Sequence, residues 1–143
     1  MDDKAMNILL VEDDEVDVMN VKRAFKKNKI RDALYVAGNG LEALEMLRGD
    51  RDSHPKIPHN RRLILLDLNM PKMNGLEFLE NLRRDPQLKA IPVIVLTTSD
   101  EDKDKVEAYS LNVAGYILKP VTFGKFSETI ETLNKYWRLS EMP

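Results

Sequence analysis

The chain has 143 residues, with 24 acidic and 22 basic side chains and no cysteine. This length fits one domain that buries roughly two-thirds of the surface its unfolded form exposes, and the lack of cysteine excludes disulfides, thiolate metal sites and thiol catalysis. A formal charge of −2 spread over both signs argues against an obligatory nucleic-acid surface, and no apolar run reaches the length of a membrane span or secretion signal, so we expect a soluble cytoplasmic protein.

The first apolar run ends on a group of acids. Residues 8–11 read Ile-Leu-Leu-Val, and four acidic residues follow at positions 12–15. A short run that is apolar throughout is typical of a strand buried on both faces in a parallel sheet. Val18, Val21 and Phe25 then recur at helical spacing, which predicts an amphipathic helix from about residue 15 to residue 27.

A second strand and helix follow, and then a long irregular segment. Residues 34–37 predict the strand, and leucines at positions 41, 44 and 47 predict a helix that ends near Gly49. The segment 50–62 is long for a connection and contains His54, His59 and two prolines. Because no helix or strand would hold the two histidines in a ligand geometry, we interpret them as incidental loop residues rather than a metal site.

A third apolar run, at residues 63–66, ends on a single carboxylate, Asp67. The carboxyl ends of the strands in an open α/β sheet form the edge at which ligands bind and chemistry occurs. Asn74, with Glu77 three residues later, has the form of a helix N-cap, so a helix should begin near Gly75 and end at Asp85-Pro86.

Two further strands and two helices complete the chain. Residues 93–96 predict a strand that is followed by Thr97, Thr98 and Ser99, and a helix begins near Asp100. Residues 115–118 predict the fifth strand, which Lys119 follows, and a last amphipathic helix reaches Trp137. The regular alternation of strands and helices indicates βαβ units around one parallel sheet, with no repeat and no second domain.

Four of the five predicted strands end on residues suited to phosphate chemistry, namely Asp13, Asp67, Thr97 and Lys119. Each residue alone is weak evidence, since an acid after a strand is usually a helix cap and a lysine is usually solvated. Three carboxylates about 5 Å apart repel by about 3 kcal/mol per pair at an effective dielectric near 20, so Glu12, Asp13 and Asp67 together require a counter-ion.

Oxygen ligands without histidine or cysteine favour Mg²⁺ at this position. The constellation suits phosphoryl transfer with Asp67 as nucleophile, Lys119 and the metal neutralising the transferring group, and Thr97 binding a phosphoryl oxygen. The site predicted from the residues is therefore an acyl-phosphate acceptor.

These motifs resemble the receiver domain of the bacterial response-regulator family. The matching segments are residues 8–14, Asp67-Leu68-Asn69-Met70-Pro71 with Asn74-Gly75, Val95-Leu96-Thr97, and Leu118-Lys119-Pro120. The resemblance covers nearly the whole chain and implies a flavodoxin-like, doubly wound α/β fold with a five-stranded parallel sheet in the order 2-1-3-4-5 and five helices. It implies one receiver domain over residues 1–143, with a core of about 6–137, a long loop at about 50–62, and no output domain.

By this resemblance, Asp67 accepts a phosphoryl group from a phosphohistidine on a sensor histidine kinase. Asp13, Asp67 and the backbone carbonyl of Asn69 would coordinate Mg²⁺, with Glu12 assisting. The Lys119-Pro120 bond resembles the family's usual cis peptide, which costs only about 0.5 to 1 kcal/mol before proline. The protein would receive phosphate and lose it slowly by self-hydrolysis, without being an enzyme.

The resemblance also implies a switch and a means of setting the phosphoryl lifetime. Thr97 and Tyr116 resemble the family's switch pair, in which the hydroxyl moves toward the phosphate and the aromatic ring follows inward. Self-dephosphorylation would be tuned at Asn69 and Ser99, neither of which supplies an obvious general base. Thr98 departs from the small residue more usual in the family, and we expect it to narrow access to the acyl phosphate.

Within the family, the chain most resembles regulators that partner cyanobacterial phytochrome histidine kinases, because of its long 50–62 loop and the runs at 67–72 and 119–123. This implies a red-light input and a homodimer through the fourth helix, fifth strand and fifth helix. Tyr109, Tyr116, Phe123 and Trp137 would lie on or near that face, although ordinary core packing explains them equally well.

Two other functions remain open from the sequence. A haloacid-dehalogenase-like phosphatase also uses an aspartate nucleophile at a strand end, but it needs a second acid two residues later, where this chain has Asn69. A binding module that ignores phosphate would not need the intact acids or Lys119. The residues therefore favour a signalling module that phosphorylation switches by changing its surface.

Overall fold

The computed structural model describes residues 5–49, 57–68, 73–97, 106–107, 111–118 and 123–139. Its strands are β1 (Asn7–Val11), β2 (Ala33–Ala37), β3 (Arg62–Asp67), β4 (Val93–Thr97) and β5 (Gly115–Leu118). They form one sheet in the order β2-β1-β3-β4-β5, and every neighbouring pair is parallel. The predicted fold class and strand order are confirmed.

The described helices are α1 (Glu15–Lys27), α2 (Gly40–Arg48), α3 (Gly75–Arg84) and α5 (Phe123–Leu139). The first three begin after an Asx residue whose side chain accepts hydrogen bonds from the first turn, namely Asp14, Asn39 and Asn74. Such a cap is worth about 1 kcal/mol because it pairs backbone N–H groups that have no partner within the helix. Of the fourth predicted helix, which should begin near Asp100, the structure describes only Val106 and Glu107, which are helical.

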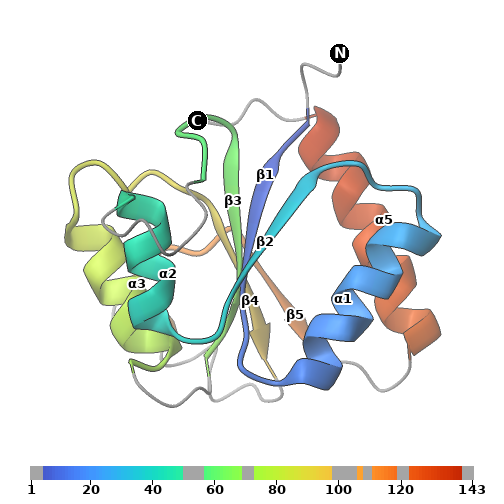
Figure 1. Ribbon diagram of the computed structural model, residues 1–143, viewed down its shortest axis with the longest axis horizontal. Coiled ribbons are helices and arrows are strands. Elements are labelled where there is room, and N and C mark those ends of the chain that lie inside the picture. Colours follow the sequence, from blue (N-terminus) through green and yellow to red (C-terminus); the bar gives the residue numbers. More distant parts are fainter. Residues whose placement is uncertain are drawn as a thin grey trace.

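The helices cover both faces of the sheet, with α1 and α5 on one side and α2 and α3 on the other (Figure 1). Successive residues of a strand point to opposite faces, so β1 supplies Leu9 and Val11 to the core under α2 and α3, and Ile8 and Leu10 to the core under α1 and α5. All six residues of β3 are buried, as expected for the central strand. Each fully buried aliphatic side chain contributes about 1.5–3 kcal/mol, and this double core holds the strand ends in place.

The placement of Trp137 decides between the two roles that the sequence left open for it, a dimer face and core packing. Its side chain is fully buried, lies 6.3 Å from the Phe25 ring, and donates a 2.8 Å hydrogen bond from Nε1 to Asp32. It is a core residue and cannot line a dimer face. Phe123 is half-buried under the guanidinium of Arg23, which lies 4.2 Å from the ring centroid.

The segment 50–62 is described only from residue 57 onward. Ile57 is buried in the core under α2 and α3, whereas His59 is exposed. His54 lies outside the described residues, so the histidine interpretation is untested for that residue. Among the helices that the structure describes, none is both long enough and apolar enough to cross a membrane.

Candidate functional site

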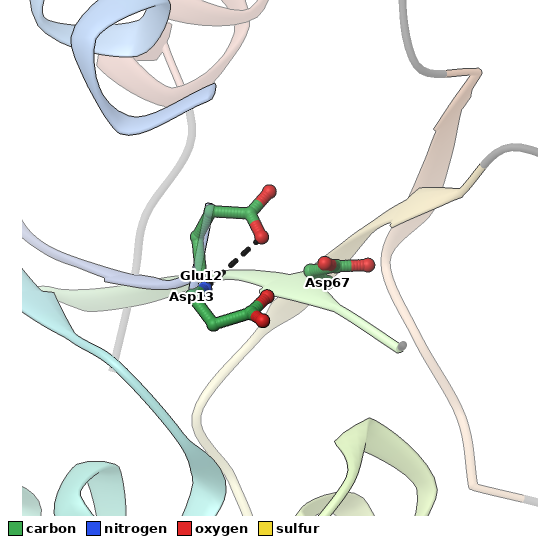
Figure 2. Close-up of side chains that lie close together, drawn as sticks. All are labelled: Glu12, Asp13 and Asp67. Atoms are coloured by element: carbon green, nitrogen blue, oxygen red, sulfur yellow. Dashed lines mark hydrogen bonds between the residues drawn. The ribbon is translucent and has the colours of Figure 1, made fainter. Parts of the chain in front are cut away.

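Three carboxylates meet where β1 and β3 end. The two strands pair side by side with Val11 opposite Leu66, so Glu12 and Asp13 leave β1 beside Asp67, the last residue of β3. One carboxylate oxygen from each of the three residues lies within 4.8 Å of the others. In Figure 2 the carboxylates of Glu12 and Asp13 lie on the side that faces Asp67.

The three acids differ in exposure. The side chains of Glu12 and Asp67 are buried, with residue exposures of 2% and 4%, while Asp13 is exposed. At this separation each pair of charges repels by about 3 kcal/mol at an effective dielectric near 20, and burial of two of them limits screening by solvent. The cluster therefore favours binding of a cation.

The acids that follow β1 have distinct structural roles. Glu12 Oε2 accepts hydrogen bonds from the backbone N–H groups of Asp13, at 3.1 Å, and Asp14, at 3.4 Å, so its carboxylate is turned back toward the strand end (Figure 2). Asp14 instead caps α1, because its Oδ1 accepts from the backbone N–H groups of Val16 and Asp17. Capping therefore separates Asp14 from the cluster, although the sequence places it directly beside Asp13.

The donor set fits a hard divalent cation. All three side chains offer carboxylate oxygens, which are the ligands that Mg²⁺ and Mn²⁺ prefer over nitrogen or sulfur. Mg²⁺ usually keeps several of its waters and takes only a few protein ligands. The exposure of Asp13 leaves that side of the cluster accessible to solvent, as such a partly hydrated ion requires.

Two of the other predicted site residues lie on described strands. Thr97 is the last residue of β4, paired with Leu118 of β5, so its backbone reaches the same edge of the sheet as Asp67. Tyr116 of β5 is half-buried, and burial, with a smaller contribution from the charge of Glu107, raises the pKa of its phenol above the usual value. Its hydroxyl therefore keeps its proton at neutral pH.

The remaining predicted site residues lie outside the described residues. They are Asn69, Thr98, Ser99 and Lys119, together with the Lys119-Pro120 peptide bond. The roles assigned to them stay predictions. The structure thus brings together Glu12, Asp13 and Asp67, and it places the backbone of Thr97 at the same edge.

Comparison with known proteins decides the family. The model of the response regulator receiver domain matches residues 8–131 of this chain. The chain belongs to this family. The receiver spans the five strands and the acidic cluster, so the match includes every element that builds the site.

Similar proteins include a regulatory protein and a response regulator. The receiver is 39% identical over 130 residues to the probable methanogenesis regulatory protein FilR2 of Methanothrix harundinacea, covering 91% of this chain and 82% of that protein. It is 36% identical over 132 residues to response regulator Rcp1 of Synechocystis sp., covering 91% and 87% of the two chains.

Solved structures give the same result. The structure of the phosphorylated cyanobacterial phytochrome response regulator RcpA superposes on this one with a TM-score of 0.80. The two chains are 32% identical, and the match covers 97% of this chain and 99% of that chain. The Mn²⁺-bound form of Rcp1 has a TM-score of 0.78 and 35% identity, over 95% and 97%. The receiver is therefore a phosphoacceptor response regulator with a histidine kinase as its partner, and neither the phosphatase nor the phosphate-independent binding module is favoured.

Proposed function

We propose that Asp67 is the residue that accepts the phosphoryl group. A carboxylate oxygen of Asp67 attacks the phosphorus of a kinase phosphohistidine, an O–P bond forms as the N–P bond breaks, and the imidazole leaves with the electron pair and takes a proton. The observation that carries this assignment is the position of Asp67 at the end of the central strand, beside Glu12 and Asp13.

The same cluster would hold the metal. Asp13, Asp67 and the backbone carbonyl of Asn69 would bind Mg²⁺, with Glu12 assisting, and the ion supplies charge neutralisation to the transferring phosphoryl group. The fit is supported by the all-oxygen donor set, and Rcp1 has a solved Mn²⁺-bound form. Without a cation, the charges of Glu12 and Asp13 would repel an incoming phosphoryl group.

The other predicted residues complete the proposal. Lys119 would add positive charge beside the phosphoryl group, and Thr97 would donate its hydroxyl to a phosphoryl oxygen. Tyr116 would follow Thr97 inward and so convert phosphorylation into a change of surface. Asn69, Thr98 and Ser99 would set the phosphoryl lifetime. The phosphoryl group would then be lost by slow self-hydrolysis.

For the partner, we propose a histidine kinase of the phytochrome type. RcpA and the solved regulator RtBRR, which is 40% identical with a TM-score of 0.78 and coverage of 97% and 84% of the two chains, are a phytochrome and a bacteriophytochrome response regulator. Phosphotransfer should be faster from a phytochrome-type kinase than from a chemotaxis kinase at equal concentration. Equal rates would remove the basis for a light input.

A homodimer through the fourth helix, β5 and α5 is the second part of this proposal. Since Trp137 is buried, the surface must be built from other residues of α5, of which Tyr136 is 59% exposed. Light scattering with and without a phosphate mimic measures the oligomeric state directly. A monomer in both states would rule out this assembly.

The phosphoacceptor assignment is tested by intact mass after incubation with Mg²⁺ and a small phosphodonor such as acetyl phosphate. We expect the mass of one phosphoryl group on the wild-type chain and none on Asp67→Asn. Asp14→Asn is the matched control, since asparagine caps a helix as well as aspartate does, and it should keep the adduct. An adduct that survives Asp67→Asn would assign the phosphate to another residue.

A further inference from the structure

Two helices at the site edge begin with a glycine that has no room for a side chain. Gly40 opens α2 and Gly75 opens α3, and both residues are buried. Neither has a positive φ, so backbone conformation does not explain the glycine. In both cases the reason is instead a close approach between segments that are distant in the sequence.

Gly75 packs directly against the backbone of Asp67 and Leu68. Its N–H donates a 3.0 Å hydrogen bond to the Leu68 carbonyl, and a Cβ added to it would overlap the Leu68 Cα and lie 2.7 Å from the Asp67 carbonyl oxygen. The first turn of α3 thus lies against the main chain of the proposed phosphoacceptor. A shift of this turn would move Asp67.

Gly40 makes a similar close contact, but with Met73, the residue two positions before Gly75, and not with Asp67 itself. Its N–H donates a 3.2 Å hydrogen bond to the carbonyl of Met73, and an added Cβ would lie 2.7 Å from that oxygen, 2.9 Å from Met73 Cγ and 3.0 Å from Phe78 Cβ. Met73 has a left-handed backbone, with φ 52°, and lies two residues before Gly75. Phe78 is fully buried, so the contact lies in the core and cannot be relieved by turning the ring into solvent.

We propose that Gly40 is a positioning residue for the phosphoacceptor, acting through Met73 and Gly75 on the backbone of Asp67. This inference rests on the proposed function of Asp67. The contact partner of Gly40 is a backbone oxygen, which cannot rotate away as the end of a flexible side chain can. A side chain at position 40 therefore has to displace either α2 or the start of α3.

Such a displacement should affect the site more than the fold. The core on both faces of the sheet is built from many residues, and a shift of a few tenths of an ångström at one helix end leaves most of them in contact. Reactivity is far more sensitive, since about 1 Å of misplacement can cost a factor of about 100 in rate. The beginnings of α2 and α3 would thus act together to aim Asp67 at the cation and the phosphodonor.

The chain supplies a matched control two residues away. Gly38 lies in the same turn, also has no positive φ, and an added Cβ would meet only Glu42 Oε2, at an ordinary distance of 3.6 Å. Gly38→Ala and Gly40→Ala are therefore the same chemical change with different steric consequences. Ile130→Val, in the buried core under α1 and α5, supplies a variant that loses stability on the opposite face of the sheet from α2 and α3.

The test measures Mg²⁺ affinity by calorimetry on unphosphorylated protein, the phosphorylation rate with acetyl phosphate, and the thermal midpoint. Gly40→Ala should weaken Mg²⁺ binding and slow phosphorylation by about tenfold. Gly38→Ala should stay within about twofold of wild type in both. Ile130→Val should lower the midpoint with Mg²⁺ affinity unchanged, as expected for a purely structural role.

A second variant covers the case in which Gly40→Ala does not fold. This variant combines Gly40→Ala with Met73→Gly: the glycine suits the left-handed backbone at position 73 and removes the contact with Met73 Cγ, while the contact with the carbonyl oxygen of residue 73 remains. The double variant should therefore fold and still bind Mg²⁺ at least about threefold more weakly than wild type. Wild-type affinity in Gly40→Ala, or in the double variant where only that one folds, would overturn the inference. Failure of the wild-type chain to form an Asp67 adduct would instead overturn the proposed function.

Discussion

The two edges of the parallel sheet both hold buried carboxylates, but at one edge three carboxylates lie close together, whereas at the other a carboxylate joins distant segments through hydrogen bonds. At the edge where the strands begin, Asp32 is 6% exposed and accepts hydrogen bonds from the Met6 backbone N–H at 3.0 Å, from Trp137 Nε1 at 2.8 Å and from Asn134 Nδ2 at 3.3 Å. These donors lie at the residue before β1 and on α5. The carboxylate therefore joins the residue before β2 to these two parts of the fold and is stabilised by hydrogen bonds from both.

At the edge where the strands end, Glu12, Asp13 and Asp67 lie close to one another. Their mutual repulsion opposes folding, and a bound cation would offset it. The difference separates an acid with a structural role from a cluster whose chemistry suits a cation. Asp32 stabilises the structure through its hydrogen-bond donors, whereas the three carboxylates at the other edge repel one another and would be stabilised by a bound cation.

The largest expected change in stability is at Asp32, at the edge where the strands begin. Asp32→Ala should lower the free energy of unfolding by about 3 kcal/mol, because the Trp137 and Met6 N–H groups lose a charged acceptor while staying buried. Urea denaturation followed by circular dichroism measures it. Glu128→Ala, an exposed acid on α5, is the control and should stay within about 0.5 kcal/mol of wild type. A change in the free energy of unfolding that is as small for Asp32→Ala as for Glu128→Ala would contradict the stabilising role of Asp32.

Mg²⁺ should stabilise the chain through the acidic cluster, at the edge where the strands end. Mg²⁺ at 100 times its dissociation constant should raise the free energy of unfolding of the wild-type chain by about 2.7 kcal/mol, and a chelator should reverse the change. Denaturation with and without Mg²⁺ gives the value. The gain should largely disappear in Asp13→Asn, and its persistence there would place the ion elsewhere.

In the absence of metal, Asp13→Asn should make the chain more stable by about 1 kcal/mol. The substitution removes one charge from the cluster, and the gain is smaller than the full pairwise repulsion because Asp13 is exposed and screened. Urea denaturation with a chelator present measures it. Asp14→Asn, which keeps the helix cap, should be nearly neutral. A loss of stability in Asp13→Asn would contradict the assigned repulsion.

The smallest expected effect concerns Asp85, a half-buried acid with donors of its own. A hydrogen bond from the Gln87 backbone and the nearby Arg48 guanidinium, whose Nε lies 3.2 Å from Oδ2, hold the pKa of this carboxyl below its usual range. A lowered pKa in the folded state stabilises the fold above the unfolded-state value, near 4, and this contribution is lost as pH falls through the folded-state value.

Asp85→Asn should therefore be less stable than wild type at pH 7, by under about 1 kcal/mol because Arg48 is exposed, and the difference should vanish in strong acid. Denaturation curves from pH 7 down to acid measure the difference between the two proteins. A difference that grows as the pH falls would have the wrong sign for this mechanism.

Much of the fold was predictable because its signals are local. Apolar runs marked all five strands to within a residue or so at each end, and the Asx residue before α3 marked its start at Gly75. The acids after β1 and β3 were predictable as neighbours, since parallel strands align their carboxyl ends. The helical spacing that ends on Trp137 allowed a buried role as well as a surface role, but it did not predict the hydrogen bond to Asp32, which lies 105 residues away in the chain.

The amino-acid sequence alone determined which segments become strands and helices and which polar residues follow each strand, because hydrophobic periodicity and helix capping act over a few neighbouring residues. Only the tertiary structure decided that Asp14 caps a helix while Asp13 joins the acidic cluster, and that Gly40 is confined while Gly38 is not. Those outcomes depend on distances of a few ångströms between segments far apart in the chain, and no local pattern encodes such distances.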